Sequence, residues 1–269
     1  MKNLHDKVAL VTGSASGIGK ATALKLAEEG AHLVLADINE EGLKSASSEI
    51  EALGRKALSV KTDVSKRDQV EQLCQKALAE FGRVDILMNN AGVALISEIK
   101  DTELSEWEWI LGIHLWGAIY TIHYLLPQMV ERKSGHIINI SSWAGILGTP
   151  TCGAYATAKF GLVGMSEVLR TELERFDIGV TVVCPGMVKT NVFSSAKMKG
   201  FKREFVEKGG TFGTSPEAVA RKIVRAVKRN QAVVLTDLAK VAWSIKRLSP
   251  ALGRQFLKVF LKASERARG

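Results

Sequence analysis

The stretch KVALVTGSASGIGK, residues 7–20, decides the fold of this chain. It begins with a run of apolar residues, continues with a turn that contains Gly13, Gly17 and Gly19, and ends where a helical pattern starts. Glycines in such a turn remove the side chains that would block a phosphate, and the first N–H groups of the helix attract an anion. The stretch therefore predicts a strand, a turn and a helix that bind a pyrophosphate. A glycine-rich turn without a ligand is the alternative.

Further apolar strands alternate with helical segments along the chain. We expect strands at residues 7–11, 31–36, 56–61, 85–88, 136–140, 179–184 and 232–235. We expect helices at residues 17–29, 40–53, 66–80, 153–176 and 216–229, a long helix ending near 130, and caps at Ser65 and Ser215. Short apolar strands separated by helices predict an α/β fold, a doubly wound parallel sheet of about seven strands with helices on both faces.

The chain length and composition are those of a globular protein. Its 269 residues are 46% hydrophobic and 24% charged, and no low-complexity linker interrupts them. We expect residues 1–237 to form one dinucleotide-binding catalytic domain and residues 238–269 to extend it as a basic amphipathic helical segment. The cysteines form no CxxC pair and the histidines show no metal-ligand spacing, so we expect reduced thiols and no metal site. The N-terminal residues do not resemble a secretory signal, which favours a cytoplasmic location, with membrane association left open.

Two segments raise the question of a membrane. Residues 109–130 contain no Lys, Arg, Asp or Glu and are long enough for a span, but two histidines, two tyrosines and a proline favour a buried interface helix. Residues 238–269 contain eight basic residues and one acidic residue, a net charge of +7. Apolar residues recur there at helical spacing, so this tail can contact an anionic membrane, an acidic partner, its own domain or a neighbouring subunit.

Asp37 ends the second predicted strand, 20 residues after Gly17. A carboxylate at this place accepts hydrogen bonds from the adenosine ribose hydroxyls of NAD and repels the 2′-phosphate of NADP. Neither Ser16 nor Ile38 offers a basic group to that phosphate. The sequence therefore favours NAD over NADP, with a plain turn role for Asp37 as the alternative.

At this point the chain resembles the short-chain dehydrogenase/reductase family, in its single-domain, NAD-preferring form and over residues 7–235. The resemblance implies a Rossmann-like fold and a hydride transfer between NAD and an alcohol or carbonyl. It rests on TGSASGIG, on the pair Asp63-Val64, on NNAG at 89–92, and on PG at 185–186 followed by Thr190. The implied cofactor contacts are Gly13, Ser16, Gly17, Ile18, Gly19, Asp37, Asp63, Val64, Asn90, Ala91, Gly92, Tyr155, Lys159, Pro185, Gly186, Val188 and Thr190.

The catalytic residues are implied by the same resemblance. Tyr155 and Lys159 stand four residues apart in YATAK at a predicted helix start, and Ser142 precedes Tyr155 by 13 residues. Tyr155 would exchange the proton with the substrate oxygen, and Ser142 would donate a hydrogen bond to that oxygen. Lys159 would bind the nicotinamide ribose and lower the pKa of Tyr155.

One position departs from the family pattern. His114 in ILGIHLWG occupies the place where the family usually has an asparagine that helps hold a water in a proton relay. Histidine donates and accepts hydrogen bonds and titrates near neutrality, so three roles stay open. His114 would take the place of the asparagine in the relay, alter the pH profile of the relay, or only shape the helix. We favour an activity that is preserved but modified.

The substrate side is the least determined. Residues 187–213 correspond to the family's lid, and their apolar residues favour a lipophilic alcohol or ketone, such as a steroid, retinoid, fatty or aromatic compound. Trp143, Cys152, Met187 and Phe193 are candidate pocket residues, although packing alone explains apolar residues equally well. We expect a small-molecule substrate, no nucleic acid, and a homodimer or homotetramer. The alternative function is a catalytically weak NAD-binding regulator or scaffold with a membrane- or partner-binding basic tail.

Overall fold

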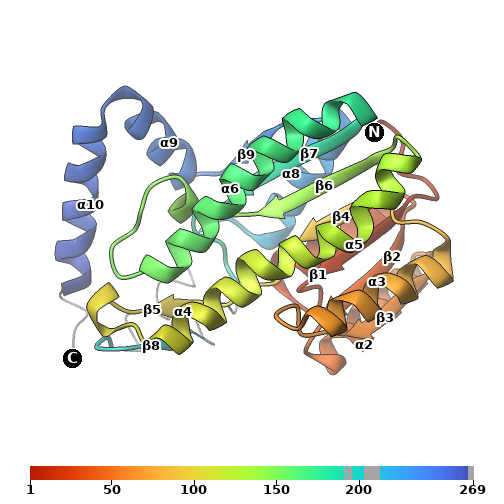
Figure 1. The fold of residues 1–269 in the computed structure, drawn as a ribbon, viewed down its shortest axis with the longest axis horizontal. Helices are drawn as coiled ribbons and strands as arrows, with labels where there is room; N and C mark the ends of the chain where they lie inside the picture. Colours follow the sequence, from red (N-terminus) through yellow and green to blue (C-terminus); the bar gives the residue numbers. More distant parts are fainter. Residues whose placement is uncertain (191, 193–195, 203–212, 266–269) are drawn as a thin grey trace.

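The computed structural model describes residues 1–190, 192, 196–202 and 213–265. Its described part contains a parallel sheet of seven strands in the order β3-β2-β1-β4-β6-β7-β9 (Figure 1). The chain runs outward from β1 to one edge, then crosses back and builds the other half, which is the doubly wound topology predicted from the sequence. The strands are β1 (Val8–Thr12), β2 (His32–Asp37), β3 (Ala57–Lys61), β4 (Ile86–Asn89), β6 (Gly135–Ile140), β7 (Ile178–Cys184) and β9 (Val233–Leu235).

Helices cover both faces of this sheet. One face carries α1 (Gly17–Glu28), α2 (Glu40–Ala52) and α8 (Pro216–Arg229). The other carries α3 (Arg67–Phe81), α5 (Gly117–Glu131) and α6 (Gly153–Leu173). Ser215 caps α8 as expected, its Oγ accepting from the Ala218 N–H, but the expected cap at Ser65 is wrong. Lys66 occupies that position, and the Ser65 hydroxyl donates to Asp63 instead.

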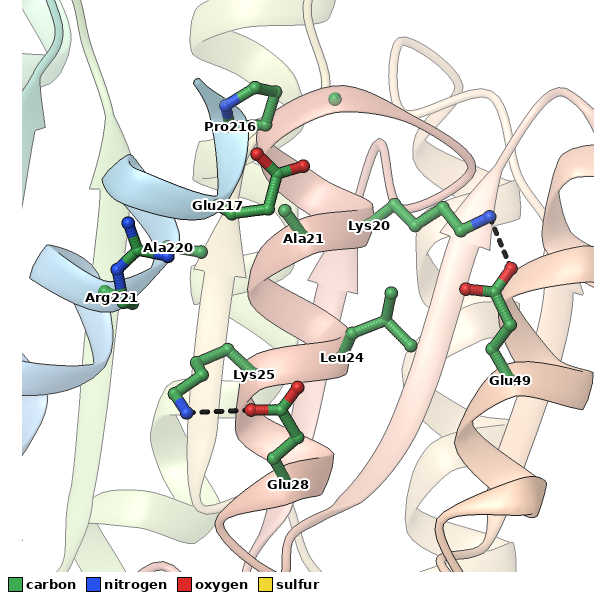
Figure 2. Close-up of a pocket in the computed structure, with 11 residues that line it drawn as sticks. Lys20, Ala21, Leu24, Lys25, Glu28, Glu49, Pro216, Glu217, Ala220 and Arg221 are labelled. Atoms are coloured by element: carbon green, nitrogen blue, oxygen red, sulfur yellow. Dashed lines mark hydrogen bonds and ion pairs between the residues drawn. The ribbon is translucent and has the colours of Figure 1, made fainter. Parts of the chain in front are cut away.

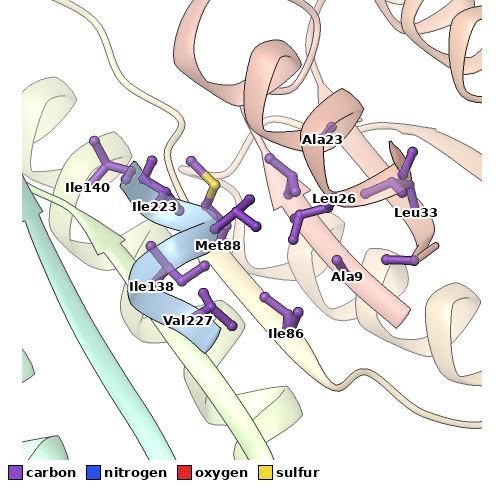
Figure 3. Packing of buried hydrophobic residues seen from close by; sticks show 14 of the residues in the cluster. Ala9, Ala23, Leu26, Leu33, Ile86, Met88, Ile138, Ile140, Ile223 and Val227 are labelled. Atoms are coloured by element: carbon purple, nitrogen blue, oxygen red, sulfur yellow. The ribbon is translucent and has the colours of Figure 1, made fainter. Parts of the chain in front are cut away.

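Alternate strand residues enter opposite layers of the core. Ala9 and Val11 pack with α1 and α8, whereas Val8 and Leu10 pack with α3 and α5. Figure 3 shows the first layer, in which Leu26 of α1 and Ile223 of α8 contact side chains from the central strands. Because both faces are covered, every residue of β1 is buried, and a continuous apolar run is the pattern that this burial requires.

The long apolar helix has an irregular middle. It consists of α4 (Leu104–Leu111), a π-helical segment η2 (Gly112–Trp116) and α5. By length and composition alone, Leu104–Glu131 passes for a membrane span. Within this fold α4 packs on α6 and α5 packs on α3. Burial of the helix in a subunit interface stays a prediction.

Smaller elements gather at the carboxyl ends of the strands (Figure 1). The strands β5 (Leu95–Ile96) and β8 (Lys197–Met198) pair in parallel and join the segments that follow β4 and β7. The 3-10 turns η1 (Ile99–Asp101) and η3 (Trp143–Gly145) also follow strands at this edge, whereas η4 (Glu174–Phe176) precedes β7 at the opposite edge. The last described helices of the chain are α9 (Leu238–Leu248) and α10 (Pro250–Glu265). None of the small sheet, the π segment or η1 was expected from the sequence.

Candidate active site

The glycine turn has the geometry that a pyrophosphate site requires. Gly13 and Gly17 have φ of +64° and +54°, a region that other residues rarely adopt. A Cβ on Gly19 would collide with the Gly13 carbonyl oxygen, so α1 approaches β1 as closely as bare backbone allows. Ser16 is the N-cap residue of α1 and makes no side-chain capping bond, while Ile18 packs against the core below. The first N–H groups of α1 therefore face outward, available to an anion.

Residues after β4 hold this turn in place. Asn90 Nδ2 donates to the carbonyl oxygens of Thr12 and Gly13, each at 2.9 Å. The Thr12 hydroxyl in turn accepts from the N–H groups of Asn90 and Ala91 at 3.0 and 3.1 Å. The NNAG sequence thus supports the glycine turn through the side chain of Asn90 and through the backbone N–H groups of Asn90 and Ala91.

The two acidic candidates lie at the ends of neighbouring strands. Asp37, at the end of β2, accepts from the Ala15 N–H at 3.0 Å and from the Asn39 N–H at 3.0 Å. These bonds fix the carboxylate beside the glycine turn, and they also fit the turn role that was kept as an alternative. Asp63 accepts from the Ser65 N–H and hydroxyl, and Val64 is buried against Gly117.

The segment after β7 comes back to the same place. The Gly186 N–H donates to the Thr236 hydroxyl at 3.1 Å, and the Pro185 carbonyl accepts from the Trp143 N–H at 2.9 Å. Val188 is buried, and Thr190 lies so close to the glycine turn that a Cβ on Gly17 would be 3.1 Å from its methyl group. Residues predicted to contact opposite ends of one dinucleotide therefore lie around a single site.

Ser142, Tyr155 and Lys159 also come together at this edge of the sheet. Ser142 follows β6 and caps η3, its Oγ accepting from the Ala144 N–H at 3.2 Å. Tyr155 and Lys159 project from the first turns of α6, and the lysine Nζ lies 5.5 Å from the centre of the tyrosine ring. That ammonium group donates to the Ile140 carbonyl oxygen at 2.7 Å, which anchors it at the end of β6.

Burial dominates the electrostatics of this cluster. Desolvation raises the pKa of Tyr155 to about 12, and a hydrogen bond from Ser142 acts in the opposite direction. Desolvation also lowers the pKa of Lys159 to about 7, only partly opposed by Cys184. The expectation that Lys159 would lower the tyrosine pKa is thus not met by these residues alone, because each charged form is disfavoured by its loss of water.

His114 stands next to this cluster. Its ring lies edge-on to Tyr155 with 5.1 Å between centres, and its Nε2 is 2.8 Å from the Val93 carbonyl oxygen. A Cβ on Gly92 would be 2.5 Å from His114 Cε1, so the imidazole fills the space that another residue at 92 would need. In the described part of the chain, Nδ1 is buried without a partner, beside a cavity of about 10 Å³ that also meets Lys159 and suits roughly one water molecule.

The buried His114 does not keep the near-neutral pKa of an ordinary histidine. Burial first, and then the nearby Lys159, lower its pKa well below 6.5, while the backbone hydrogen bond at Val93 only partly opposes them. The imidazole ring is therefore neutral across the physiological pH range. Of the three roles considered, burial disfavours the one in which protonation of His114 alters the pH profile.

The four candidate substrate residues have different surroundings. Trp143 is buried against Ile146, Leu147 and the first helix of the C-terminal tail. Cys152 is partly exposed at the start of α6, and burial of its thiol raises the pKa to about 11. Met187 is half-buried and accepts from the Thr214 N–H through its carbonyl oxygen.

Phe193 lies outside the described residues, as do the lid residues Phe205, Gly209, Gly210 and Phe212. The described part of the predicted lid contacts α4 and its N-cap residue Glu103 through two ion pairs and a cation–π contact. Lys199 Nζ lies 2.8 Å from Glu103 and 3.1 Å from Glu106, and Lys197 Nζ lies 4.1 Å from the Trp109 ring centre.

A separate groove of about 520 Å³ lies between α1, α2 and α8 (Figure 2). It is lined by ion pairs, with Lys20 and Glu49 2.7 Å apart and Lys25 and Glu28 2.7 Å apart. Gly17 is the one cofactor candidate that reaches it, and none of the catalytic candidates lines it. The groove therefore lies outside the cluster around Tyr155.

The family model of short chain dehydrogenases matches residues 7–199. This chain belongs to the short-chain dehydrogenase/reductase family. It is 33% identical over 258 residues to a CLA biosynthesis dehydrogenase/reductase of Lactiplantibacillus plantarum, covering 88% of this chain and 90% of that one. It is 36% identical over 225 residues to the 3-oxoacyl-acyl-carrier-protein reductase FabG of Thermotoga maritima, covering 82% and 90%.

A solved member of the short-chain dehydrogenase/reductase family has the same fold. The structure of such an enzyme from Burkholderia phymatum in complex with NAD superposes with a TM-score of 0.87, at 28% identity and over 94% of this chain and 96% of that one. In our structure, the start of α1, whose N-cap Ser16 makes no side-chain capping bond, and the left-handed backbone of Gly13 and Gly17 fit a dinucleotide. The chain is accordingly an oxidoreductase of the short-chain dehydrogenase/reductase family with a Rossmann-like fold.

Proposed function

We propose that this chain is an NAD-dependent short-chain alcohol dehydrogenase or ketone reductase that acts on a lipophilic primary or secondary alcohol or the matching carbonyl compound. The observation that carries the proposal is the meeting of Ser142, Tyr155 and Lys159 beside the glycine turn, at the carboxyl ends of the strands. Bound NAD would supply the acceptor for the substrate's hydride.

The protein's own residues handle the proton. In alcohol oxidation, the Tyr155 phenolate accepts the hydroxyl proton, and in carbonyl reduction the neutral phenol donates one. Ser142 donates a hydrogen bond to the same substrate oxygen. In the protein without substrate, the Ser142 hydroxyl donates to Tyr155 and favours the phenolate. The positive charges of protonated Lys159 and of the oxidised nicotinamide ring would favour the phenolate further.

The cofactor is held mainly by backbone. The turn at Gly13–Gly19 would bind the pyrophosphate, and Asp37 the adenosine ribose hydroxyls. Lys159 has three N–H donors, of which one points at Ile140, so it can also bind the nicotinamide ribose. Asn90, Gly186 and Thr190 complete the cradle. Asp37, exposed Ser16 and exposed Ile38 bring no positive charge to a 2′-phosphate, which supports NAD over NADP.

His114 is proposed as a positioning residue that holds Val93 and the Tyr155 ring, and not as a proton carrier. Residues 1–237 are proposed as the catalytic domain and residues 238–269 as its extension. A cytoplasmic homodimer or homotetramer is proposed for the assembly, since such oligomers are typical of the family. The relatives named above are reductases and dehydrogenases, so nothing favours the alternative of a catalytically weak regulator or scaffold.

The test is a screen of NADH absorbance over steroid, retinoid, long-chain and aromatic alcohols, run in parallel with NADP. A 3-oxoacyl thioester with NADH and NADPH forms a further arm, because one relative is named a reductase of such substrates. We expect turnover of a lipophilic alcohol with a higher catalytic efficiency for NAD. Preference for NADP would overturn the assignment of Asp37, and turnover of the thioester alone would overturn the substrate class.

A further inference from the structure

The two C-terminal helices expose large apolar side chains. Leu248 is 82% exposed, Val259 69%, Leu252 53% and Val241 48%. Leu252 and Val259 are seven residues apart in α10 and so share one side of that helix. Single exposed apolar residues are normal, but a group on two adjacent helices marks a contact surface.

Cations lie beside these apolar residues. Arg254, Lys258 and Lys262 recur every four residues along α10, and all three are exposed. They contribute to the net charge of +7 that residues 238–269 carry, in which Glu265 is the single acid. A surface of this kind is complementary to a partner that combines anionic groups with an apolar interior.

The opposite side of the helix pair is attached to the catalytic wall. Ala239 and Ala242 of α9, with Phe256 and Leu257 of α10, pack in one cluster with Trp143 and Leu147. Lys246 Nζ donates to the Ile146 carbonyl oxygen at 2.7 Å. Figure 1 shows α9 and α10 at one end of the molecule, beside the loop between β6 and α6. The pair is therefore fixed to the segment that follows Ser142, with its outer side left exposed.

A second basic row on this chain helps to decide between partners. Arg221, Arg225 and Arg229 of α8 are also exposed and also recur every four residues. No residue of α8 is among the exposed large hydrophobic side chains, which distinguishes this row from the one on α10. Of these two described basic rows, the one on α10 lies beside exposed apolar side chains and the one on α8 does not. Positive charge combined with exposed apolar side chains fits a lipid surface better than an acidic protein or nucleic acid.

We propose that the outer side of α9–α10 docks on an anionic phospholipid bilayer. Leu248, Leu252 and Val259 enter the boundary between headgroups and acyl chains, and Arg254, Lys258 and Lys262 meet the lipid phosphates. Docking places the wall next to Ser142 at the membrane surface, where a lipophilic substrate is concentrated. That last consequence rests on the proposed function, whereas the docking itself does not.

The test is co-sedimentation of the full chain with vesicles of phosphatidylcholine alone or mixed with phosphatidylglycerol. We expect binding to the mixed vesicles, little binding to phosphatidylcholine, and release by salt. The variant Arg254→Gln/Lys258→Gln/Lys262→Gln should bind the mixed vesicles roughly a hundredfold more weakly. The variant Leu252→Gln/Val259→Gln should lose about tenfold or more.

The matched control is Arg221→Gln/Arg225→Gln/Arg229→Gln, which removes the same charge with the same spacing from α8. It should bind within about threefold of the parent chain, because distant exposed charges are screened. Equal loss in both triple variants would overturn the proposal by showing that net charge alone drives binding.

Two further results would also overturn the docking. One is an absence of binding to mixed vesicles. The other is a change of oligomeric state in Leu252→Gln/Val259→Gln on size-exclusion chromatography, with vesicle binding unaltered, which would assign the surface to a second copy of the chain. Circular dichroism establishes that each variant is folded, and NAD-dependent turnover of a water-miscible alcohol without vesicles tests the proposed function separately.

Discussion

The cofactor end and the catalytic end of this site depend on different chemical groups. At the glycine turn, the backbone provides the shape, and Asn90 and Thr12 fix it with neutral hydrogen bonds. At the catalytic end, Tyr155, Lys159 and His114 are ionisable groups whose pKa values burial displaces. The comparison teaches that the first region should be sensitive to added atoms, and the second to pH and to removed donors.

Tyr155→Phe should have the largest effect and acts only at the catalytic end. Loss of the proton-exchanging hydroxyl should lower kcat by roughly 10⁴-fold, near the upper end for general acid–base catalysis. The dissociation constant for NAD, measured by tryptophan fluorescence or calorimetry, should stay nearly unchanged. Considerable residual turnover would remove Tyr155 from the mechanism, and a parallel loss of NAD binding would erase the distinction between the two ends.

Ser142→Ala should lower kcat by about 10²–10³-fold, the usual cost of one donor to a reacting oxygen. Alcohol oxidation needs the phenolate, so its kcat/KM should rise with pH up to the ionisation of Tyr155. The Ser142 hydrogen bond lowers the pKa of Tyr155, so its removal should move this rise to higher pH. Ser142→Thr keeps the hydroxyl and is the control. A pH profile unchanged in the alanine variant contradicts the assignment.

Gly19→Ala tests the cofactor end by adding one methyl group. That methyl collides with the Gly13 carbonyl oxygen, so the NAD dissociation constant should rise by about tenfold or more at every pH. Gly164→Ala in α6 is the control, because nothing lies within 4 Å of the added Cβ and alanine favours a helix by about 0.5–1 kcal/mol. Tight NAD binding by Gly19→Ala, with normal thermal stability, would show that the turn is not shaped by close packing.

Gly92 and His114 join the two ends and should give the smallest effect. The Cβ added by Gly92→Ala collides with His114 Cε1, so this substitution should lower kcat/KM. In a chain that also carries His114→Asn, the loss of kcat/KM caused by Gly92→Ala should be roughly 2–100-fold smaller. Because His114 is neutral, His114→Asn alone should leave the shape of the pH profile between pH 5 and 8 unchanged. Additive effects in the double variant would mean that the two residues act independently. A shifted profile would restore His114 as a titrating group.

The sequence predicted the large elements well for a physical reason. Each of the seven sheet strands begins and ends within one residue of its expected bounds. For the central strands the reason is that a strand buried on both faces must be largely apolar. The edge strands β3 and β9 are more exposed, but their short apolar runs still stand out between helical segments. The residues for β5 and β8 escaped notice since two-residue strands have no period to detect. The π segment was missed as well, because its apolar residues continue the pattern of the helices on either side.

The site was predicted less completely than the fold. The four-residue spacing placed Tyr155 and Lys159 on one helix face, and the family resemblance added Ser142 at the end of a strand; the structure brings these three residues together. The pKa displacements depend on burial, which the local sequence does not reveal. The cap expected at Ser65 is wrong because α3 begins one residue later than expected, which puts Lys66 at the N-cap position.

Because of the π segment at Gly112–Trp116, the number of residues in this helix determines how α4 and α5 are oriented relative to each other. A π turn holds one residue more than the α turn it replaces, so it takes up an extra residue that would otherwise rotate α5 by about 100° relative to α4. A one-residue deletion or insertion in α4 or α5, where no wide turn compensates, would either move His114 away from Val93 or turn the apolar stripe of α5 away from α3. Such changes on either side of the π segment should therefore be far less tolerated than substitutions at the same positions.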